Sequence, residues 1–267
     1  MTSPTRPDRP ELFAIMSALP QEQAGLLELL VEPQKVKRAG RTFWLGKLEG
    51  QPVVLGLSRI GKVSAAIAAT VLIEHFGATQ LLFTGVAGGL GDNVAVGDVV
   101  VAQEFIQHDL DVSPLFPRYE VPAYQRSRFA CDSVMTQSLL CVTREVIGQS
   151  DGPCRANGFT DARVHAGLIA SGDRFVCGAD ESTQLKAALM SAGHAALAVE
   201  MEGAAVAQVC ADYGLPYAAM RTISDRADDE AHLDFGRFIE TVAGPYAVRV
   251  ILGFLKHQRE REGTETT

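Results

Sequence analysis

The sequence predicts an α/β fold: a single domain with a central, twisted, mostly parallel or mixed sheet flanked by helices on both faces. Two observations predict it. Apolar runs such as LFAIMSAL (12–19) and LLFTGVAGGLG (81–91) are continuous rather than alternating, as in strands buried on both faces. Helix-like stretches such as KVSAAIAATVLIEHF (62–76) separate these runs without internal repeats, and this alternation favours a parallel sheet with helical crossovers.

The first half of the chain supplies the elements in a regular order. Residues 1–10, rich in proline and charge, are expected to form a disordered tail. The first strand covers 12–19, and Pro20 opens a helix with Glu22 in its first turn. TFWLGKLEGQPVVLGLS (42–58) predicts a hairpin that turns at Glu49-Gly50. The expected elements that follow are a helix at 62–76, strands at 81–91 and 98–112, and a long loop with three prolines at 113–131.

The second half repeats the alternation. Helices are expected at 132–147, 181–193, about 201–213 and 235–257, and strands at 164–173, 196–199 and 215–224. Residues 258–267 (QREREGTETT) are expected to form a frayed tail. We see no linker inside the body, so residues 11–257 are expected to form one domain.

Composition excludes several classes of protein. A net charge of −8 on 267 residues argues against a sequence-independent nucleic-acid binder, which needs a basic surface. The five cysteines are odd in number and scattered, without CxxC, as in a reduced cytoplasmic protein. The N-terminus lacks the apolar core of a signal peptide, and no run is long enough to span a bilayer. We therefore expect a cytoplasmic protein without a metal or redox cofactor.

Two glycine-rich turns follow strands. Residues 56–62 (GLSRIGK) have the spacing of a phosphate-binding loop, but Val63 replaces the hydroxyl that would hold magnesium. The turn is instead expected to present backbone amides to a ligand at a helix N-terminus. TGVAGGLG (84–91), which contains Ala87 and Gly88, is not GxGxxG. Its glycines would let the backbone approach a flat ligand closely. Alternatively, they have a purely structural role and allow a sharp turn with positive φ at the end of the strand.

Three further segments carry chemistry, each with a structural alternative. In SGDRFV (171–176) an exposed Phe175 would stack on a base, although core packing is favoured by the segment alone. Glu200 and Glu202 lie at the start of a predicted helix, where the helix dipole stabilises carboxylates. Their role is either this structural one or the binding of ribose hydroxyls. Ser224 and Asp225 end a strand, and this Asp is either a general acid with a raised pKa or a turn cap. No serine lies in GxSxG, so a Ser-His-Asp nucleophile is not supported.

Taken together and in order, these segments resemble one family. They are SRIGKVSAA (58–66), TGVAGGL (84–90), VGDVVVA (96–102), SGDRFV (171–176), AVEMEGAAVAQVC (198–210) and RTISDRADDEAHLDF (221–235). They are similar to the 5′-methylthioadenosine/S-adenosylhomocysteine nucleosidases of the purine nucleoside phosphorylase superfamily, over about residues 12–255. The resemblance implies a nucleoside phosphorylase-like fold, hydrolysis of a purine N-glycosidic bond and a place in methionine salvage.

The resemblance also assigns roles to single residues. Asp225, oriented by Ser224, would protonate adenine N7. Glu22 would activate the attacking water and Arg221 would help to hold it. Glu202 would bind the ribose hydroxyls. The other residues expected to contact substrate are Met201 under the sugar, Phe175 and Val176 at the purine, Glu200, Ala87 and Gly88 in the same walls, and Ile60 and Phe235 around the 5′-substituent. Val112 and the loop 108–124 would reach into the site of a neighbouring subunit, which implies a homodimer.

Residues also bear on the nucleophile and the substrate. The strand 81–84 is uncharged where the phosphorylase branch has an arginine, and Glu22 would repel a phosphate dianion. Water is therefore the expected nucleophile, with a phosphorylase, an aminofutalosine hydrolase or a non-catalytic nucleoside binder as alternatives. The chain departs from the family's pattern at Arg59, Val86, Arg174 and the loop 108–124. A polar or carboxylated 5′-group would have Arg118 or Arg174 to bind to. Apolar neighbours Ile223 and Ala227 would help to raise the pKa of Asp225.

Overall fold

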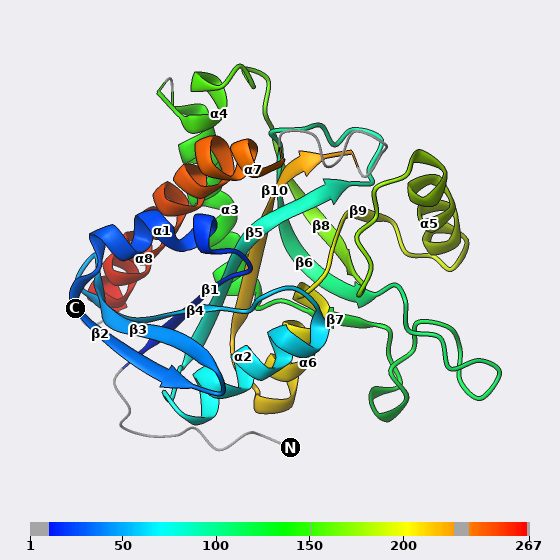
Figure 1. Cartoon of the computed structure of the whole chain (residues 1–267), viewed down its shortest axis with the longest axis horizontal. Coiled ribbons are helices and arrows are strands. Elements are labelled where there is room, and N and C mark those ends of the chain that lie inside the picture. Colours follow the sequence, from blue (N-terminus) through cyan, green and yellow to red (C-terminus); the bar gives the residue numbers. More distant parts are fainter. Residues whose placement is uncertain (1–10, 150, 227–234, 266–267) are drawn as a thin grey trace.

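A ten-stranded mixed sheet forms the centre of the computed structural model, which describes residues 11–149, 151–226 and 235–265 (Figure 1). Its order is β10-β6-β8-β9-β5-β1-β4-β3-β2, and β7 pairs with β6. The strands are β1 (Phe13–Ser17), β2 (Val31–Arg38), β3 (Arg41–Leu48), β4 (Gln51–Leu57), β5 (Gln80–Gly89), β6 (Val99–Gln107), β7 (Arg128–Ala130), β8 (Val164–Ser171), β9 (Ala196–Glu200) and β10 (Tyr217–Asp225).

The strands fall into two parallel groups that run in opposite directions. β4, β1, β5 and β10 are mutually parallel, and so are β6, β8 and β9. β10 pairs antiparallel with β6, and β5 pairs antiparallel with β9. Because β10 also pairs with β5, the strands β5, β10, β6, β8 and β9 close into a ring. Strand ends from both groups therefore meet at one place.

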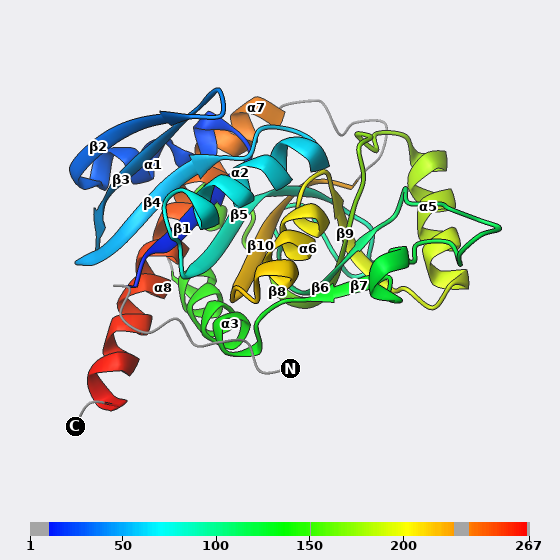
Figure 2. The ribbon, with the colours of Figure 1, turned by 90° about the horizontal axis from the view of Figure 1, so that it is seen from below.

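Helices cover both faces of the sheet, as the sequence predicts (Figure 2). Odd-numbered apolar residues of β1, such as Phe13 and Ile15, face the core under α1 (Pro20–Leu29), α3 (Ser133–Gly148) and α8 (Gly244–Glu265). Even-numbered ones, Ala14 and Met16, face α2 (Lys62–Glu74) and α6 (Gly203–Tyr213). The remaining helical segments are η1 (Pro122–Tyr124), α4 (Pro153–Ala156), α5 (Ala179–Ser191), α7 (Phe235–Phe238) and the π-helical turn η2 (Ile239–Ala243). The two-faced burial of β1 explains why its sequence is continuously apolar.

Several predicted elements are confirmed and others need correction. The hairpin of β3 and β4 turns at Glu49 and Gly50, both with positive φ. The edge strand β2 was not expected, and the loop 113–131 contains η1 and β7. The frayed tail expected at 258–267 is wrong for the residues described there, because α8 continues to Glu265. Arg259 donates to Glu49 O, and Arg261 donates to Ser138 Oγ. The tail expected at 1–10 lies outside the described residues.

The C-terminal helix corrects the expectation that no run is long enough to cross a membrane. The segment Gly236–Arg261 meets that test by length and composition, yet 61% of its apolar window is buried inside the protein. Tyr246, Val250 and Phe254 are fully buried against the core shared with α1 and α3. The apolar character of this segment is accounted for by core packing.

Candidate active site

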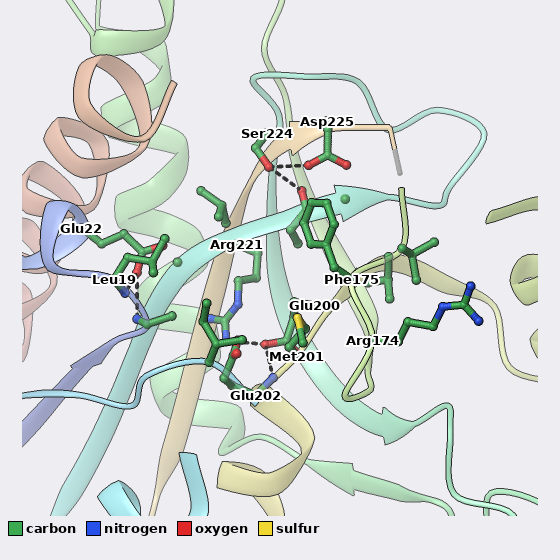
Figure 3. A pocket seen from close by; sticks show the side chains of 18 residues that line it. Leu19, Glu22, Arg174, Phe175, Glu200, Met201, Glu202, Arg221, Ser224 and Asp225 are labelled. Atoms are coloured by element: carbon green, nitrogen blue, oxygen red, sulfur yellow. Dashed lines mark hydrogen bonds and ion pairs between the residues drawn. The ribbon is translucent and has the colours of Figure 1, made fainter. Parts of the chain in front are cut away.

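A pocket with about 730 Å³ of empty space, part of it open to solvent, lies where β1, β5, β8, β9 and β10 end (Figure 3). Strand ends of an α/β sheet are a common place for ligands. Most residues singled out in the sequence line it: Glu22, Ile60, Ala87, Gly88, Phe175, Val176, Glu200, Met201, Glu202, Arg221, Ser224 and Asp225. Ala18, Leu19, Gly85 and Val199 also line it, although no site role was predicted for them from the sequence. So do Val86 and Arg174, which depart from the family's pattern.

Glu22 is held in the first turn of α1 and is 1% exposed. Its Oε2 accepts hydrogen bonds from the backbone N–H groups of Ala18 (2.8 Å) and Leu19 (2.9 Å). Its Oε1 has no hydrogen-bond partner among the described residues, although the nearby Val86 backbone favours the ionised form. Burial raises the pKa of Glu22, while those amides and the charge of Arg221 oppose the rise. One oxygen is thus anchored and the other is available to a ligand or a water.

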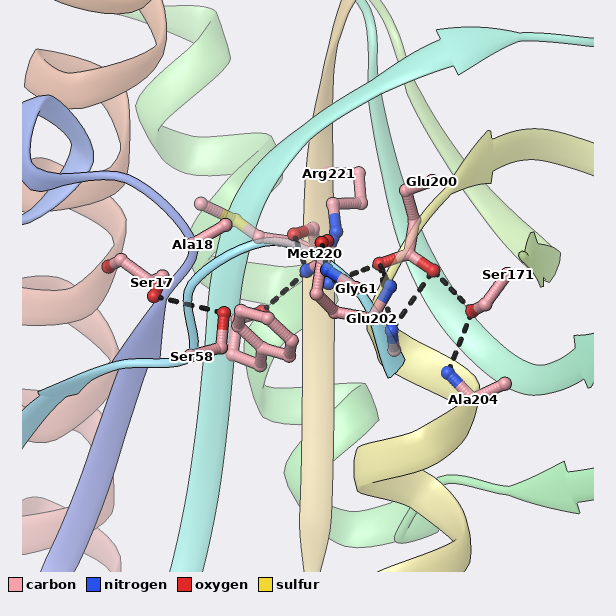
Figure 4. A network of polar contacts seen from close by, with 12 residues as sticks. Ser17, Ala18, Ser58, Gly61, Ser171, Glu200, Glu202, Ala204, Met220 and Arg221 are labelled. Atoms are coloured by element: carbon pink, nitrogen blue, oxygen red, sulfur yellow. Dashed lines mark hydrogen bonds and ion pairs between the residues drawn. The ribbon is translucent and has the colours of Figure 1, made fainter. Parts of the chain in front are cut away.

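Arg221 and Glu200 form a buried ion pair beneath the pocket (Figure 4). The Arg221 Nη2 donates to Glu200 Oε2 at 2.8 Å, and Nη1 donates to the carbonyls of Phe83 (3.2 Å) and Met220 (3.0 Å). The guanidinium also stacks 4.1 Å from the Phe83 ring centroid. Burial opposes the charge, yet Glu200 raises the pKa of Arg221. Both terminal nitrogens are therefore committed to protein groups, and Nε alone is left toward the pocket.

Glu200 caps the helix that follows it. Its carboxylate accepts from the N–H groups of Glu202 (3.2 Å) and Gly203 (2.8 and 3.0 Å) and from Ser171 Oγ. Ser171 Oγ in turn accepts from Ala204 N–H at 2.7 Å. Of the two roles considered for Glu200, the structure shows the helix-terminus role. Its oxygens are occupied by the protein rather than directed at a ligand.

Glu202 is the N-cap residue of α6, but its carboxylate turns into the pocket instead of capping the helix. Its Oε1 accepts from the Gly61 N–H at 2.8 Å. Burial and the neighbouring Glu200 carboxylate raise the pKa of Glu202 to about 8. A carboxyl that is 6% exposed and has one oxygen still unassigned is suited to bind hydroxyl groups.

Ser224 and Asp225 lie at the end of β10, where a register shift interrupts its pairing with β5. The Ser224 Oγ donates to Asp225 Oδ2 at 2.7 Å and reaches Ala87 O at 3.5 Å. Asp225 pairs in the ladder with Gly88 and is 7% exposed. The bulge turns this carboxyl toward the same pocket as Glu22 and Glu202, although the three belong to distant parts of the chain.

The apolar wall of the pocket comes from loops. Phe175 is 46% exposed and lines the pocket, in contrast to the core packing that the segment alone favoured. Val176 is buried beside it, Met201 lies between the two glutamates, and Ile60 is exposed at the mouth. Val112 is half-buried in the loop 108–124, which projects from the body and is called the projecting loop below, and it does not line this pocket. The Phe235 side chain lies outside the described residues, as does Ala227.

The arginines that depart from the family's pattern have separate positions. Arg59 has positive φ and donates to Gly40 O at 2.6 Å, away from the pocket. Arg118 pairs with Asp111 on the projecting loop. Arg174 lines the pocket, and its Nε lies 2.7 Å from Glu181 Oε1 on α5. Arg174 is the one of these three that borders the cavity.

This fold, with carboxyls gathered where its strands end, defines the class of the protein. Residues 12–256 match the phosphorylase superfamily, and the chain belongs to that superfamily. Within it, the relatives are nucleosidases. A 5′-methylthioadenosine/S-adenosylhomocysteine nucleosidase of Aeromonas salmonicida is 36% identical over 90% of this chain and 97% of the relative. An aminodeoxyfutalosine nucleosidase of Campylobacter jejuni is 35% identical over 85% of this chain and 91% of the relative.

A solved structure gives the same family. The 5′-methylthioadenosine/S-adenosylhomocysteine nucleosidase of Neisseria meningitidis, in complex with methylthio-immucillin-A, superposes with a TM-score of 0.79 at 33% identity. The likeness covers 92% of this chain and 99% of that one. The chain is therefore a member of the nucleosidases of this superfamily, which are hydrolases of purine N-glycosidic bonds.

Proposed function

We propose that the chain hydrolyses the N-glycosidic bond of 5′-methylthioadenosine, S-adenosylhomocysteine or both, releasing adenine and a 5-substituted ribose. The observation that carries this is the convergence of Glu22, Glu202 and Asp225 on one pocket beside Phe175. Glycosidic cleavage passes through an oxocarbenium-like state, which needs an acid for the leaving group and a base for the water. The pocket offers one carboxyl for each task and one for the sugar.

Asp225 is proposed to protonate adenine N7, with Ser224 fixing its orientation. The Ser224 Oγ donates to Asp225 Oδ2 at 2.7 Å, and this hydrogen bond orients the carboxyl that is proposed to carry a proton to the base. Protonation makes adenine a neutral leaving group. Phe175 supplies an exposed ring for stacking on the purine, and Val176 is proposed to read the base edge through its backbone.

Glu22 is proposed to activate the water. The geometry near Gly85 supports a water-binding position beside Glu22. A Cβ added to Gly85 would lie 3.3 Å from Glu22 Oε1 and 3.7 Å from Arg221 Nε. Neither of these two atoms makes a hydrogen bond within the described residues. Both atoms therefore border the space over the Gly85 Cα, where a water would find an acceptor on one side and a donor on the other. Arg221 thus contributes through Nε while its other nitrogens hold Glu200.

Glu202 is proposed to bind the ribose 2′- and 3′-hydroxyls, with Met201 beneath the sugar. Glu202 has one oxygen held by Gly61 and a second facing the pocket. Ala87 and Gly88 form the wall of β5 against which the nucleoside would lie. Ile60 and Phe235 are proposed to surround the 5′-substituent.

Water is the proposed nucleophile because the pocket is acidic where phosphate would sit. Arg221 is neutralised by Glu200, and Glu22 lies across Gly85 from it. A phosphate dianion placed there would face a carboxylate. The test is adenine release from 5′-methylthioadenosine by the purified protein in phosphate-free buffer and with added phosphate. We expect equal rates and free 5-methylthioribose, whereas release only with phosphate, as the sugar 1-phosphate, would make the protein a phosphorylase.

Aminodeoxyfutalosine is a second candidate substrate. The Campylobacter relative that is named for it is about as similar to this chain as the methylthioadenosine nucleosidases are. Arg174 borders the pocket and offers a cation to a carboxylated 5′-group. Comparing kcat/KM for the three nucleosides ranks the candidates directly.

The chain is also proposed to act as a homodimer. The loop 108–124 extends from the body on the side of β6 and β7 (Figures 1 and 2). Leu115 on this loop and Val63 on α2 are 79% and 72% exposed, and Ile67 and Phe116 add to the exposed apolar surface. Exposed large apolar side chains such as these are suited to contact a second copy of the same chain. Val112 would then contribute to the partner's pocket rather than to its own.

The enzyme is also proposed to be cytoplasmic. Cys131, Cys141, Cys177 and Cys210 are free thiols, which suits the reducing cytoplasm. The net charge of −8 gives no support to nucleic-acid binding. A nucleoside is the proposed small-molecule partner, and methionine salvage is the proposed pathway.

A further inference from the structure

A tight turn at residues 58–62 contacts the proposed sugar-binding carboxylate. Gly61 has φ +95° and directs its N–H to Glu202 Oε1 at 2.8 Å. The next amide, Lys62 N–H, donates to Asp173 Oδ1 at 2.7 Å. A side chain at Gly61 would crowd Asp173, because a Cβ there lies 3.2 Å from Oδ1. The direction of the Gly61 N–H therefore depends on how this turn is fastened.

Lys62 fastens the turn to two other loops. Its side chain, 15% exposed, makes an ion pair with Asp109 and donates to Gln107 Oε1 at 3.2 Å, both at the end of β6. Asp109 Oδ2 accepts from the N–H of Asp173, after β8, at 2.8 Å. Lys62 Nζ also lies 3.9 Å from Asp173 Oδ2. One lysine and two aspartates thus connect the loops after β4, β6 and β8.

The cluster is partly buried, and its two carboxylates share the one ammonium group of Lys62. Burial opposes ionisation of Asp109, yet hydrogen bonds from Lys62 and from the Asp173 amide keep its pKa below its ordinary value. Gln107 extends the cluster to α6, since its Nε2 donates to Gln208 Oε1 at 2.9 Å. Such a cluster is stiffer than an isolated surface ion pair, because each member is held by more than one partner.

We propose that Lys62, Asp109 and Asp173 are positioning residues, which hold the Gly61 amide against Glu202 and thereby orient the carboxylate that binds the ribose hydroxyls. The inference rests on the proposed sugar role of Glu202. Lys62 and Asp109 do not line the pocket, so their effect on substrate passes through the turn and Glu202. The same cluster lies between the loop that carries Phe175 and the start of the projecting loop 108–124.

The test is a cycle that combines a protein change with a substrate change. We would measure kcat/KM for 5′-methylthioadenosine and for its 3′-deoxy analogue with the wild type, Lys62→Met and Glu202→Ala. Lys62→Met leaves Asp109 without its cation, so the double variant Lys62→Met/Asp109→Asn, which removes both charges, is measured beside it. Lys186→Met is the matched control, because Lys186 pairs with Asp92 outside the cluster.

The expected result is a loss that depends on the hydroxyl. Small displacements of a positioning group cost up to about 100-fold in rate, so both Lys62 variants should lose about 10- to 100-fold with 5′-methylthioadenosine. With the 3′-deoxy analogue the loss should fall to about 3-fold or less, because the contact being oriented is already missing. Lys186→Met should match the wild type with both substrates.

Two outcomes overturn the inference, and they are distinguishable. If Glu202→Ala abolishes the preference for the 3′-hydroxyl but the Lys62 variants lose equally with both substrates, the cluster is only structural and the proposed sugar role stands. If Glu202→Ala leaves the hydroxyl preference unchanged, the sugar role of Glu202 is wrong, and the inference fails with it.

Discussion

Buried carboxyls are costly unless they are paired or used, and the three glutamates of this pocket illustrate three different solutions. Glu200 is paired with Arg221 and the start of α6. Glu22 has one oxygen satisfied by two amides and one oxygen without a partner. Glu202 has a pKa raised to about 8, because burial and the neighbouring Glu200 disfavour its ionised form. The unpaired groups are those to which we assign work on the substrate.

The raised pKa of Glu202 has a consequence for stability. The folded protein retains a proton that the unfolded chain releases near pH 4.5, so stability falls as the pH rises from about 4.5 through about 8. Glu202→Gln cannot ionise, and it should raise the free energy of unfolding by about 2 kcal/mol at pH 9, allowing for partial solvation. Urea unfolding at pH 9 and at pH 4 measures this effect, and the gain should vanish at pH 4.

The same variant should lose activity. Gln in place of Glu202 has one acceptor oxygen where a carboxylate has two, so it cannot accept from both ribose hydroxyls, and kcat/KM should fall while stability at pH 9 rises. A Glu202→Gln protein that is destabilised at pH 9 would contradict a Glu202 whose pKa is raised by burial and by Glu200.

Sequence reasoning named most of the residues that line the pocket but not all of their hydrogen-bond partners. The segment around Glu200 and Glu202 predicted two carboxylates near a helix start, yet their opposite directions depend on the N-cap backbone of Glu202. Phe175 was favoured as a core residue because its segment does not reveal that the loop leaves the sheet. The proposed water position near Gly85 depends on Glu22 and Arg221, which are close to each other only in the folded protein. The strand-end rule would have found Val199, which is next to last in β9, but not Gly85, which lies inside β5.

At the scale of elements, β5 carries a glycine where its backbone passes between Glu22 and Arg221. In Gly85→Ala the new methyl group would project into the space proposed for the water, with a nearest contact of 3.3 Å to Glu22 Oε1. We expect kcat to fall about 100-fold, while adenine binding changes about 3-fold or less. Turnover assays and calorimetric titration with adenine measure the two effects separately.

The matched control for this change is Gly148→Ala at the end of α3, where nothing lies within 4 Å of the added Cβ. It should keep full activity and gain up to about 1 kcal/mol of stability, as an alanine does in a helix. Wild-type turnover in Gly85→Ala would show that the water sits elsewhere.

The elements that sequence predicted best are those with one clear burial pattern. β1, β5 and the hairpin of β3 and β4 have apolar runs or turn residues that identify them. β2 was missed because its sequence, VEPQKVKR, is exposed on both faces and carries a proline, as edge strands often do. The closed ring depends on β10 pairing with both β5 and β6, and no local pattern specifies pairs so distant in sequence.

At the scale of the whole molecule, the central expectation is association of two chains through α2 and the loop 108–124. Val63 and Val134 offer a matched pair, because each is the second residue of its helix and each is well exposed, at 72% and 50%. Val63→Asp should dissociate the dimer and lower kcat/KM about 10-fold or more, since a charge at the centre of an apolar interface is costly. Val134→Asp should remain dimeric and active.

Sedimentation velocity at the assay concentration checks both variants. A wild-type protein that is active as a monomer, or a Val63→Asp protein that sediments as a dimer, would remove α2 from the interface. Oligomeric state could not be inferred from the sequence by physical argument alone, because the sequence does not show that an apolar loop residue such as Leu115 is exposed.

Two carboxyls have separate roles in the proposed mechanism. Asp225 is the general acid that protonates adenine, and Glu22 is the general base that activates the water. The most direct measurement compares Asp225→Asn and Glu22→Gln on two substrates: 5′-methylthioadenosine and a 4-nitrophenyl 5-methylthioriboside, whose leaving group needs no proton. Asp225→Asn should lose about 10²- to 10⁴-fold on the adenosine and about 10-fold or less on the nitrophenyl riboside. Glu22→Gln should lose activity on both. Equal losses of Asp225→Asn on the two substrates would contradict the assignment of Asp225 as the acid.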